Sequence, residues 1–213
     1  MLHVRFGLDL DGFKPPLMQP HFGQVTLGPL GFLYLLEVRL GLAGQWDTQP
    51  LRISQYLRCL RQADNGSRFY STSFTQDEIS VARTLLGWRD QWIESGWSGK
   101  AKETDSSRIK DMADVEVLAQ SHLSSGLADR LRAVVANLET GSPLPLQVSL
   151  IDPLEDFSWS WRSILTSLGA ECELEEVTLH QNEKIETDLQ RLQHALRTQN
   201  KCKLVGDGSV VLL

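Results

Sequence analysis

A glycine-containing turn between two apolar segments has the order of elements found in phosphate-binding loops. The stretch 24–27 predicts a short strand, the stretch 32–40 predicts a buried helix, and Gly28 and Gly31 lie between them in a Gly-Pro-Leu-Gly turn. In such a loop, backbone N–H groups and a helix N-terminus face the phosphates of a nucleotide. The alternative is that the two glycines only allow the strand to pack closely against the helix.

The side chains that a working loop of this kind uses on a triphosphate are absent. When the pattern G-x-x-x-x-G-K-[ST] is counted from Gly28, the second glycine is replaced by Leu33, the lysine by Tyr34 and the hydroxyl residue by Leu35. Without the lysine no positive charge reaches the terminal phosphates, and without Ser or Thr no hydroxyl reaches Mg²⁺. We therefore expect a vestigial nucleotide site that does not hydrolyse ATP.

A second candidate residue is an aspartate that follows an apolar strand. The stretch 146–151 predicts an interior strand, and Asp152 stands directly after it, as the magnesium-binding Asp does in nucleotide hydrolases. The next residue in those enzymes is normally an acid, but here Pro153 cannot accept a proton or orient a water molecule. The alternative is an ordinary turn Asp at a strand end. The predicted vestigial site thus comprises Gly28, Gly31 and Asp152, with no catalytic residue and no cofactor.

A different enzyme class is suggested by two acids near the N-terminus. The Leu-Asp-Leu-Asp-Gly sequence that contains Asp9 and Asp11 resembles the opening motif of haloacid-dehalogenase-type phosphatases. That resemblance implies that Asp9 is the nucleophile, Asp11 the general acid or base, and Asp207 part of a later magnesium motif. The alternative for both acids is a turn at the end of a strand.

A third candidate surface is a helical stretch rich in arginine and tryptophan. Arg83, Trp88, Arg89 and Trp92, followed by Trp97, are residue types that stack on bases and neutralise phosphates. Their spacing also fits a helix whose tryptophans enter the core and whose arginines lie at its rim. Both interpretations remain open at this point.

The composition restricts the classes of protein. The chain of 213 residues has 21 Lys and Arg against 27 Asp and Glu, a net charge of −6 that argues against nucleic-acid binding over the whole surface. The five histidines show no metal-ligand spacing, so no metal site is expected. Three widely spaced cysteines suit free thiols in a reducing cytosol. Charged residues interrupt every apolar run, so neither a signal peptide nor a membrane span is expected and the protein is predicted to be cytoplasmic.

The elements that must position these residues follow a strand–helix pattern at both ends of the chain. Strands are expected at 3–10, 24–27, 146–151, 171–179 and 203–213, and Thr75 with Glu78 has the spacing of a helix capping box. We predict an α/β fold, a parallel sheet with flanking helices, formed by residues 1–44 and 143–213. Residues 45–142 are predicted to form a mostly helical insertion.

Three stretches together resemble the N-terminal helicase-like region found in the second subunit of bacterial ATP-dependent nucleases and in related PD-(D/E)XK nuclease family proteins. These are GPLGFLYLLEVRLGL at 28–42, RFYSTSFTQDEISVARTLLGWRDQWIESGW at 68–97 and LIDPLEDFSWSWRSILTSLGA at 150–170. The resemblance implies a degenerate P-loop, helicase-like α/β core with a helical insertion, from a longer DNA repair or recombination nuclease. It also implies single-stranded or duplex DNA and a helicase–nuclease partner subunit, or the remaining domains of the chain, as partners. A plain protein-interaction module is the third alternative.

Overall fold

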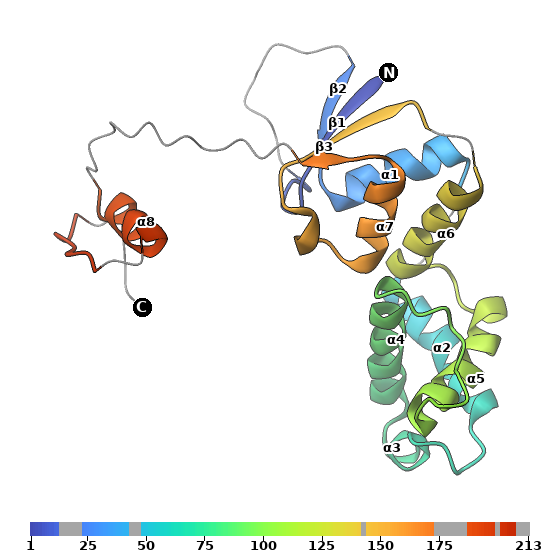
Figure 1. Cartoon of the computed structure of the whole chain (residues 1–213). Helices are drawn as coiled ribbons and strands as arrows, with labels where there is room; N and C mark the ends of the chain where they lie inside the picture. The colour runs from blue at the N-terminus through green and yellow to red at the C-terminus, as the bar shows by residue number, and fades with distance from the viewer. Residues whose placement is uncertain (13–22, 43–47, 142–143, 173–186, 199–200, 208–213) are drawn as a thin grey trace. The chain divides into compact units, whose positions relative to one another are not determined.

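The computed structural model describes residues 1–12, 23–42, 48–141, 144–172, 187–198 and 201–207. The chain divides into two compact units, Met1–Leu174 and Glu175–Leu213. The first unit contains the sheet and all helices except the last (Figure 1). Each unit is described here by itself.

The first unit is organised by a four-stranded sheet in which every pair of neighbouring strands is parallel. Its strands are β1 (Leu2–Phe6), β2 (Gln24–Leu27), β3 (Leu146–Leu150) and β4 (Glu171–Cys172), in the order β2-β1-β3-β4. Val4 is paired with Val25 on one side and with Val148 on the other, so β1 is an interior strand. The predicted α/β class and parallel sheet are confirmed.

Three helices cover the face of the sheet that carries Val4 and Phe6. They are α1 (Pro29–Leu40), α6 (Leu127–Thr140) and α7 (Trp159–Ser167), and the short 3-10 turn η1 (Leu154–Asp156) precedes α7. The Phe6 ring lies at the centre of this core, with ring centroids 4.8 Å from Phe32 and 5.0 Å from Trp161. Burial of these large aromatic surfaces, together with the aliphatic residues around them, stabilises this layer.

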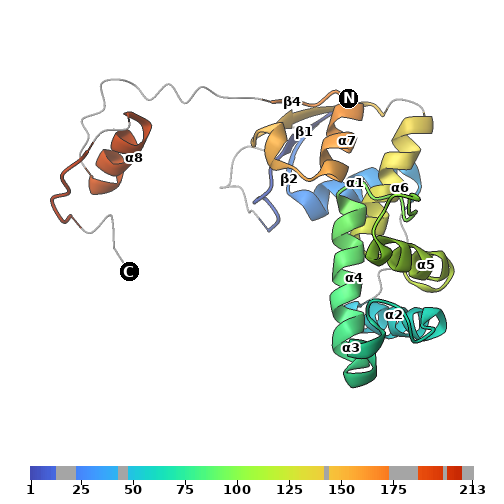
Figure 2. The same cartoon turned by 60° about the horizontal axis from the view of Figure 1, so that its bottom comes forward.

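A helical segment with its own core lies between β2–α1 and β3 in the sequence. It contains α2 (Gln49–Ala63), α3 (Ser71–Gln76), α4 (Glu78–Glu94) and α5 (Ser107–His122), which bury Tyr56, Leu86 and Met112 among others. Figure 2 shows α4 along one side of this segment, with α2 and α5 on its other side. The predicted helical segment is therefore present. The last helix of the segment is α6. It buries Leu131 and Val134 in the sheet core, and the N-terminal end of α6 contacts α4.

Several local predictions are corrected by the structure. The helix break near residue 77 is capped by Asp77, whose Oδ1 accepts the Ser80 N–H at 3.0 Å, and not by a Thr75–Glu78 box. Thr75 instead donates to the carbonyl of Ser71, because it lies inside α3. The strand predicted at 171–179 begins as β4, and residues 173–179 lie outside the described residues. In the predicted strand 203–213, residues 203–207 form no strand and the remainder lies outside the described residues.

The described part of the second unit consists of α8 (Asp188–Thr198) and the segment 201–207. Across the described residues of both units, none of the helices combines the length and apolar character that spanning a bilayer requires.

Candidate functional site

The Gly28 turn lies between β2 and α1, as the sequence predicts, and a carboxylate occupies the start of the helix. Asp11 accepts the Leu30 N–H at 2.9 Å through Oδ2 and the Gly31 N–H at 3.3 Å through Oδ1. A Cβ atom on Gly28 would lie 2.1 Å from the Asp11 backbone nitrogen. Gly28 is therefore required because the β1 loop approaches it closely, and the N–H groups that would face a phosphate hold an acid of the same chain.

The three positions that would act on a triphosphate carry side chains used differently. Leu33 is fully buried in the sheet core, and Leu35 packs against the same core. Tyr34 is 56% exposed on the surface of α1. None of them supplies an ammonium group or an aliphatic hydroxyl. Two of the three positions, Leu33 and Leu35, serve the packing of α1 instead.

Asp152 lies at the same edge of the sheet, after β3. Because β1 and β3 are adjacent and parallel, their carboxyl ends meet, and Asp152 Oδ2 accepts the Leu8 N–H at 2.7 Å. A Cβ atom on Gly7 would lie 3.1 Å from the same oxygen, so the loop after β1 passes close to Asp152. Gly28, Gly31 and Asp152 thus gather at one edge, each in contact with residues 7–11.

The acids of the phosphatase alternative lie in both units. Asp9 is exposed, whereas Asp11 is engaged at the start of α1. Asp207 belongs to the second unit, where its Oδ2 accepts the Asp188 N–H at 2.8 Å, and the neighbouring Gly208 lies outside the described residues. No observation in either unit favours this alternative.

Asp188 forms the reciprocal contact at the start of α8. Its carboxylate accepts the N–H groups of Val205, Gly206 and Asp207 at 2.6–3.2 Å. These backbone hydrogen bonds, that of Val205 foremost, hold the pKa of Asp188 below its ordinary value. The turn at Gly206 and Asp207 therefore holds the N-terminus of α8 in place through these hydrogen bonds. Within the described ranges, no group of three or more His, Cys, Asp and Glu side chains is arranged to hold a metal ion.

The arginines and tryptophans of α4 divide into exposed and buried residues. Arg83 is exposed and Trp88 is 37% exposed. Trp92 is half-buried and packs edge-on against Trp97, with ring centroids 5.5 Å apart. Arg89 is only 2% exposed, so the prediction that it contacts DNA is corrected: its helix position points it into the protein.

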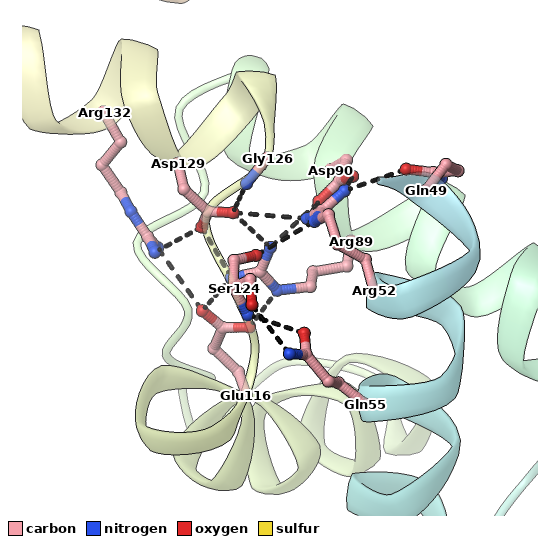
Figure 3. Close-up of polar contacts among 10 residues, drawn as sticks. All are labelled: Gln49, Arg52, Gln55, Arg89, Asp90, Glu116, Ser124, Gly126, Asp129 and Arg132. Atoms are coloured by element: carbon pink, nitrogen blue, oxygen red, sulfur yellow. Dashed lines mark hydrogen bonds and ion pairs between the residues drawn. The ribbon is translucent and has the colours of Figure 1, made fainter. Parts of the chain in front are cut away.

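Arg89 is the centre of a buried ion-pair cluster that sequence reasoning did not find (Figure 3). Its Nε lies 2.6 Å from Glu116 of α5, its Nη2 2.8 Å from Asp129 of α6, and its Nη1 2.9 Å from Asp90. Two further guanidinium groups complete the charge balance against these three carboxylates, those of Arg52 and Arg132. The cluster joins α2, α4, α5 and α6.

The electrostatics of this cluster keep Asp129 and Arg89 charged. Burial alone would raise the pKa of Asp129, but the hydrogen bonds and charge of Arg89 outweigh it, so the pKa of Asp129 lies below its ordinary value. Burial alone would likewise lower the pKa of Arg89, but the hydrogen bonds to Asp129 and Glu116 outweigh it and leave that pKa raised. These groups are mutually satisfied and are not poised for proton transfer.

Glycine at position 126 allows Arg52 to reach the cluster. A Cβ atom at Gly126 would lie 2.3 Å from the Arg52 Cζ. Arg52 also donates from Nε to the Ser124 carbonyl at 3.0 Å, so it ties α2 to the start of α6. The sequence did carry a signal, because Arg89 stands between Leu86 and Ile93 on the buried stripe of α4 and Glu116 follows Val115 on that of α5.

No protein-family model matches this chain, and no curated protein sequence matches it either.

Proposed function

We propose that this chain is a catalytically silent helicase-like domain of a DNA repair or recombination nuclease, acting as a scaffold with a DNA-facing surface. The observation that carries the proposal is Asp11, whose carboxylate accepts the N–H groups of Leu30 and Gly31 at the start of α1. A nucleotide phosphate would need the same N–H groups and would meet a negative charge there.

The position of this contact in the fold supports the same proposal. In open parallel sheets, ligands bind outside the carboxyl ends of the strands, where the strand order reverses. In the order β2-β1-β3-β4 that reversal falls between β1 and β3. There Asp152 is bound to the Leu8 N–H, so both acids at this edge hold the chain's own loop.

The proposal includes the partners that the family resemblance implies and the location that the composition predicts. These are single-stranded or duplex DNA, and either further domains of a longer chain or a helicase–nuclease partner subunit, in the cytoplasm. The scaffold role is supported by the Arg89 cluster, which ties α2, α4 and α5 to α6 and thereby to the sheet core.

Calorimetric titration with ATP and Mg²⁺ tests the proposed silence. The wild-type chain is expected to show no binding in the micromolar range and no release of phosphate. Micromolar binding with turnover would overturn the proposal. Asp11→Ala provides the matched comparison, because it frees the N–H groups of α1 without restoring the lysine or the hydroxyl; we expect it to remain inactive in hydrolysis.

A further inference from the structure

One side of α4 carries exposed residues, Arg83 among them, in a chain with a net charge of −6. The half-exposed acid Glu94 lies at the C-terminal end of this side, and the other exposed or half-exposed residues on it are Ser80, Arg83, Thr84, Gly87, Trp88 and Gln91. We call these six residues the outer face of α4. They recur at the spacing of one helical face and lie away from Leu86, Arg89 and Ile93, which α4 buries. A Cβ atom at Gly87 would meet nothing within 4 Å, so the surface of α4 is open at this position.

Trp88 is held in a pre-formed aromatic stack at the edge of this face. Its ring is nearly parallel to that of Phe69, with an interplanar angle of 9° and a centroid separation of 6.5 Å. The Arg108 guanidinium lies 5.8 Å from the centroid of the Phe69 ring. Phe69 is itself positioned by its backbone N–H, which donates to Asp111 at 2.9 Å. The orientation of the exposed indole is therefore set before any ligand arrives.

Two cations without an ion pair accompany the stack. Neither Arg83 nor Arg108 forms an ion pair with any residue that the structure describes, and both are exposed. Two carboxylates close to Phe69 share one guanidinium, because Arg68 pairs with Asp111 at 2.7 Å and with Asp114 at 2.5 Å.

Two acids lie near the start of the outer face. Asp77 accepts the Ser80 N–H as the cap of α4, and Glu78 is paired with Arg61. The hydrogen bonds of Asp77 to Ser80, with a smaller contribution from the charge of Arg83, hold the pKa of Asp77 below its ordinary value. The guanidinium groups of Arg83 and Arg108 therefore remain available to an anionic partner.

We infer that Trp88, supported by Phe69, stacks on a base of single-stranded DNA while Arg83 and Arg108 contact its phosphates. An exposed indole can stack on any base, since every base offers a π-face, but only where that base is not already stacked in a duplex. The available guanidinium groups favour a polyanion over an uncharged protein surface. The inference names the DNA-contacting surface of the proposed function, on which it rests.

Fluorescence anisotropy of a labelled oligothymidine, titrated with the 213-residue chain, tests the inference. Trp88→Ala is expected to weaken binding about 5- to 150-fold, the loss associated with one stacked base. Trp88→Phe should retain most of the affinity. The matched control is Trp159→Ala, because Trp159 is 44% exposed on α7 and lies outside the outer face. Circular dichroism verifies that each variant is folded.

The salt dependence provides a second readout that a purely structural role of Trp88 would not change. Each phosphate contact on single strands contributes about −0.7 to the slope of log K against log salt, so Arg83→Gln and Arg108→Gln should each make the slope shallower by about that amount. Arg39→Gln, which removes an exposed arginine of α1, should leave the slope unchanged.

Three outcomes would overturn the inference. The first is an unchanged affinity of Trp88→Ala for oligothymidine, and the second is an equal loss of that affinity in Trp159→Ala. The third is a Trp88→Ala variant that loses self-association but binds DNA as before, which would identify a protein interface. These results are separable from the nucleotide titration. If the chain binds oligothymidine through Trp88 but hydrolyses ATP, only the proposed lack of ATP hydrolysis is contradicted. If the chain does not hydrolyse ATP and Trp88→Ala does not weaken binding, only this inference is contradicted.

Discussion

The sheet edge and the helical segment of this protein both place acidic side chains where chemistry could occur, but they neutralise them in different ways. At the sheet edge, Asp11 and Asp152 accept backbone N–H groups and remain close to solvent. In the helical segment, Glu116 is buried, Asp129 is largely buried, and both face guanidinium groups. An acid on backbone N–H groups fastens a loop locally, whereas a buried ion pair joins whole helices and is costly to break.

The largest expected effect comes from removing the central cation of the helical segment. Arg89→Met would leave Glu116, which is 1% exposed, without its closest partner. Losing one member of a buried ion pair costs about 3–5 kcal/mol, so the free energy of unfolding should fall by that amount. Urea denaturation measures it. The exposed Arg83→Met on the same helix should change the free energy by less than about 0.5 kcal/mol. If Arg89→Met and Arg83→Met lowered the free energy of unfolding equally, burial would not explain the difference expected between the two arginines.

A smaller effect is expected where a glycine makes room for Arg52. Gly126→Ala would bring a Cβ within 2.3 Å of the Arg52 Cζ, so the guanidinium must shift away from its partners. The cost of such overpacking is about 1–3 kcal/mol. Gly87→Ala is the matched control, because its Cβ meets nothing within 4 Å and alanine favours the helix interior by about 0.5–1 kcal/mol. Thermal unfolding of both variants should therefore shift in opposite directions.

At the sheet edge, the expected loss in the free energy of unfolding is the size of one removed helix cap. Asp11→Ala removes the acceptor of the Leu30 and Gly31 N–H groups, and should lower the free energy of unfolding by about 1 kcal/mol. Asp9→Ala, two residues away and exposed, should leave it within about 0.5 kcal/mol. A loss above about 3 kcal/mol in Asp11→Ala, the size expected for a broken buried ion pair, would contradict the distinction between the two regions.

The smallest expected effect is on the pH dependence of the free energy of unfolding. The pKa of Asp129 is lower in the folded protein than its ordinary value of 3.8, so its contribution to stability is present above that value and is lost as the pH falls through the folded pKa. Wild-type stability should therefore decline below about pH 4. In Asp129→Asn the decline should be shallower over this acidic range, as measured by urea denaturation at a series of pH values. An identical slope would show that Asp129 does not titrate with unfolding.

Much of the fold could be predicted because the apolar pattern is local. The strands β2 and β3, the helix after Gly28 and the helical segment follow from residues that alternate or recur within a few positions. The cap at Asp77 was missed because the Thr75–Glu78 spacing matched a capping box, and only the chain direction at the α3–α4 break decides which side chain reaches the Ser80 N–H.

The candidate site was predictable only in part. The absence of a lysine and a hydroxyl is visible in the letters at positions 34 and 35. The sequence does not show that Asp11 binds N–H groups 19 and 20 residues further along the chain. That contact depends on the loop after β1 passing the start of α1. The stack of Phe69 on Trp88 likewise joins residues that no helical spacing relates.

The amino-acid sequence by itself determined most of the elements, their buried faces and the residue types at positions 33 to 35, since these depend on residue type and on spacing within one helix or strand. Tertiary structure alone decided which charged groups meet: that Arg89 enters a buried cluster while Arg83 stays exposed, and that Asp11 occupies the start of α1. The physical reason is that apolar burial is set by local periodicity, whereas a polar pair requires two atoms from distant segments to lie within about 3 Å.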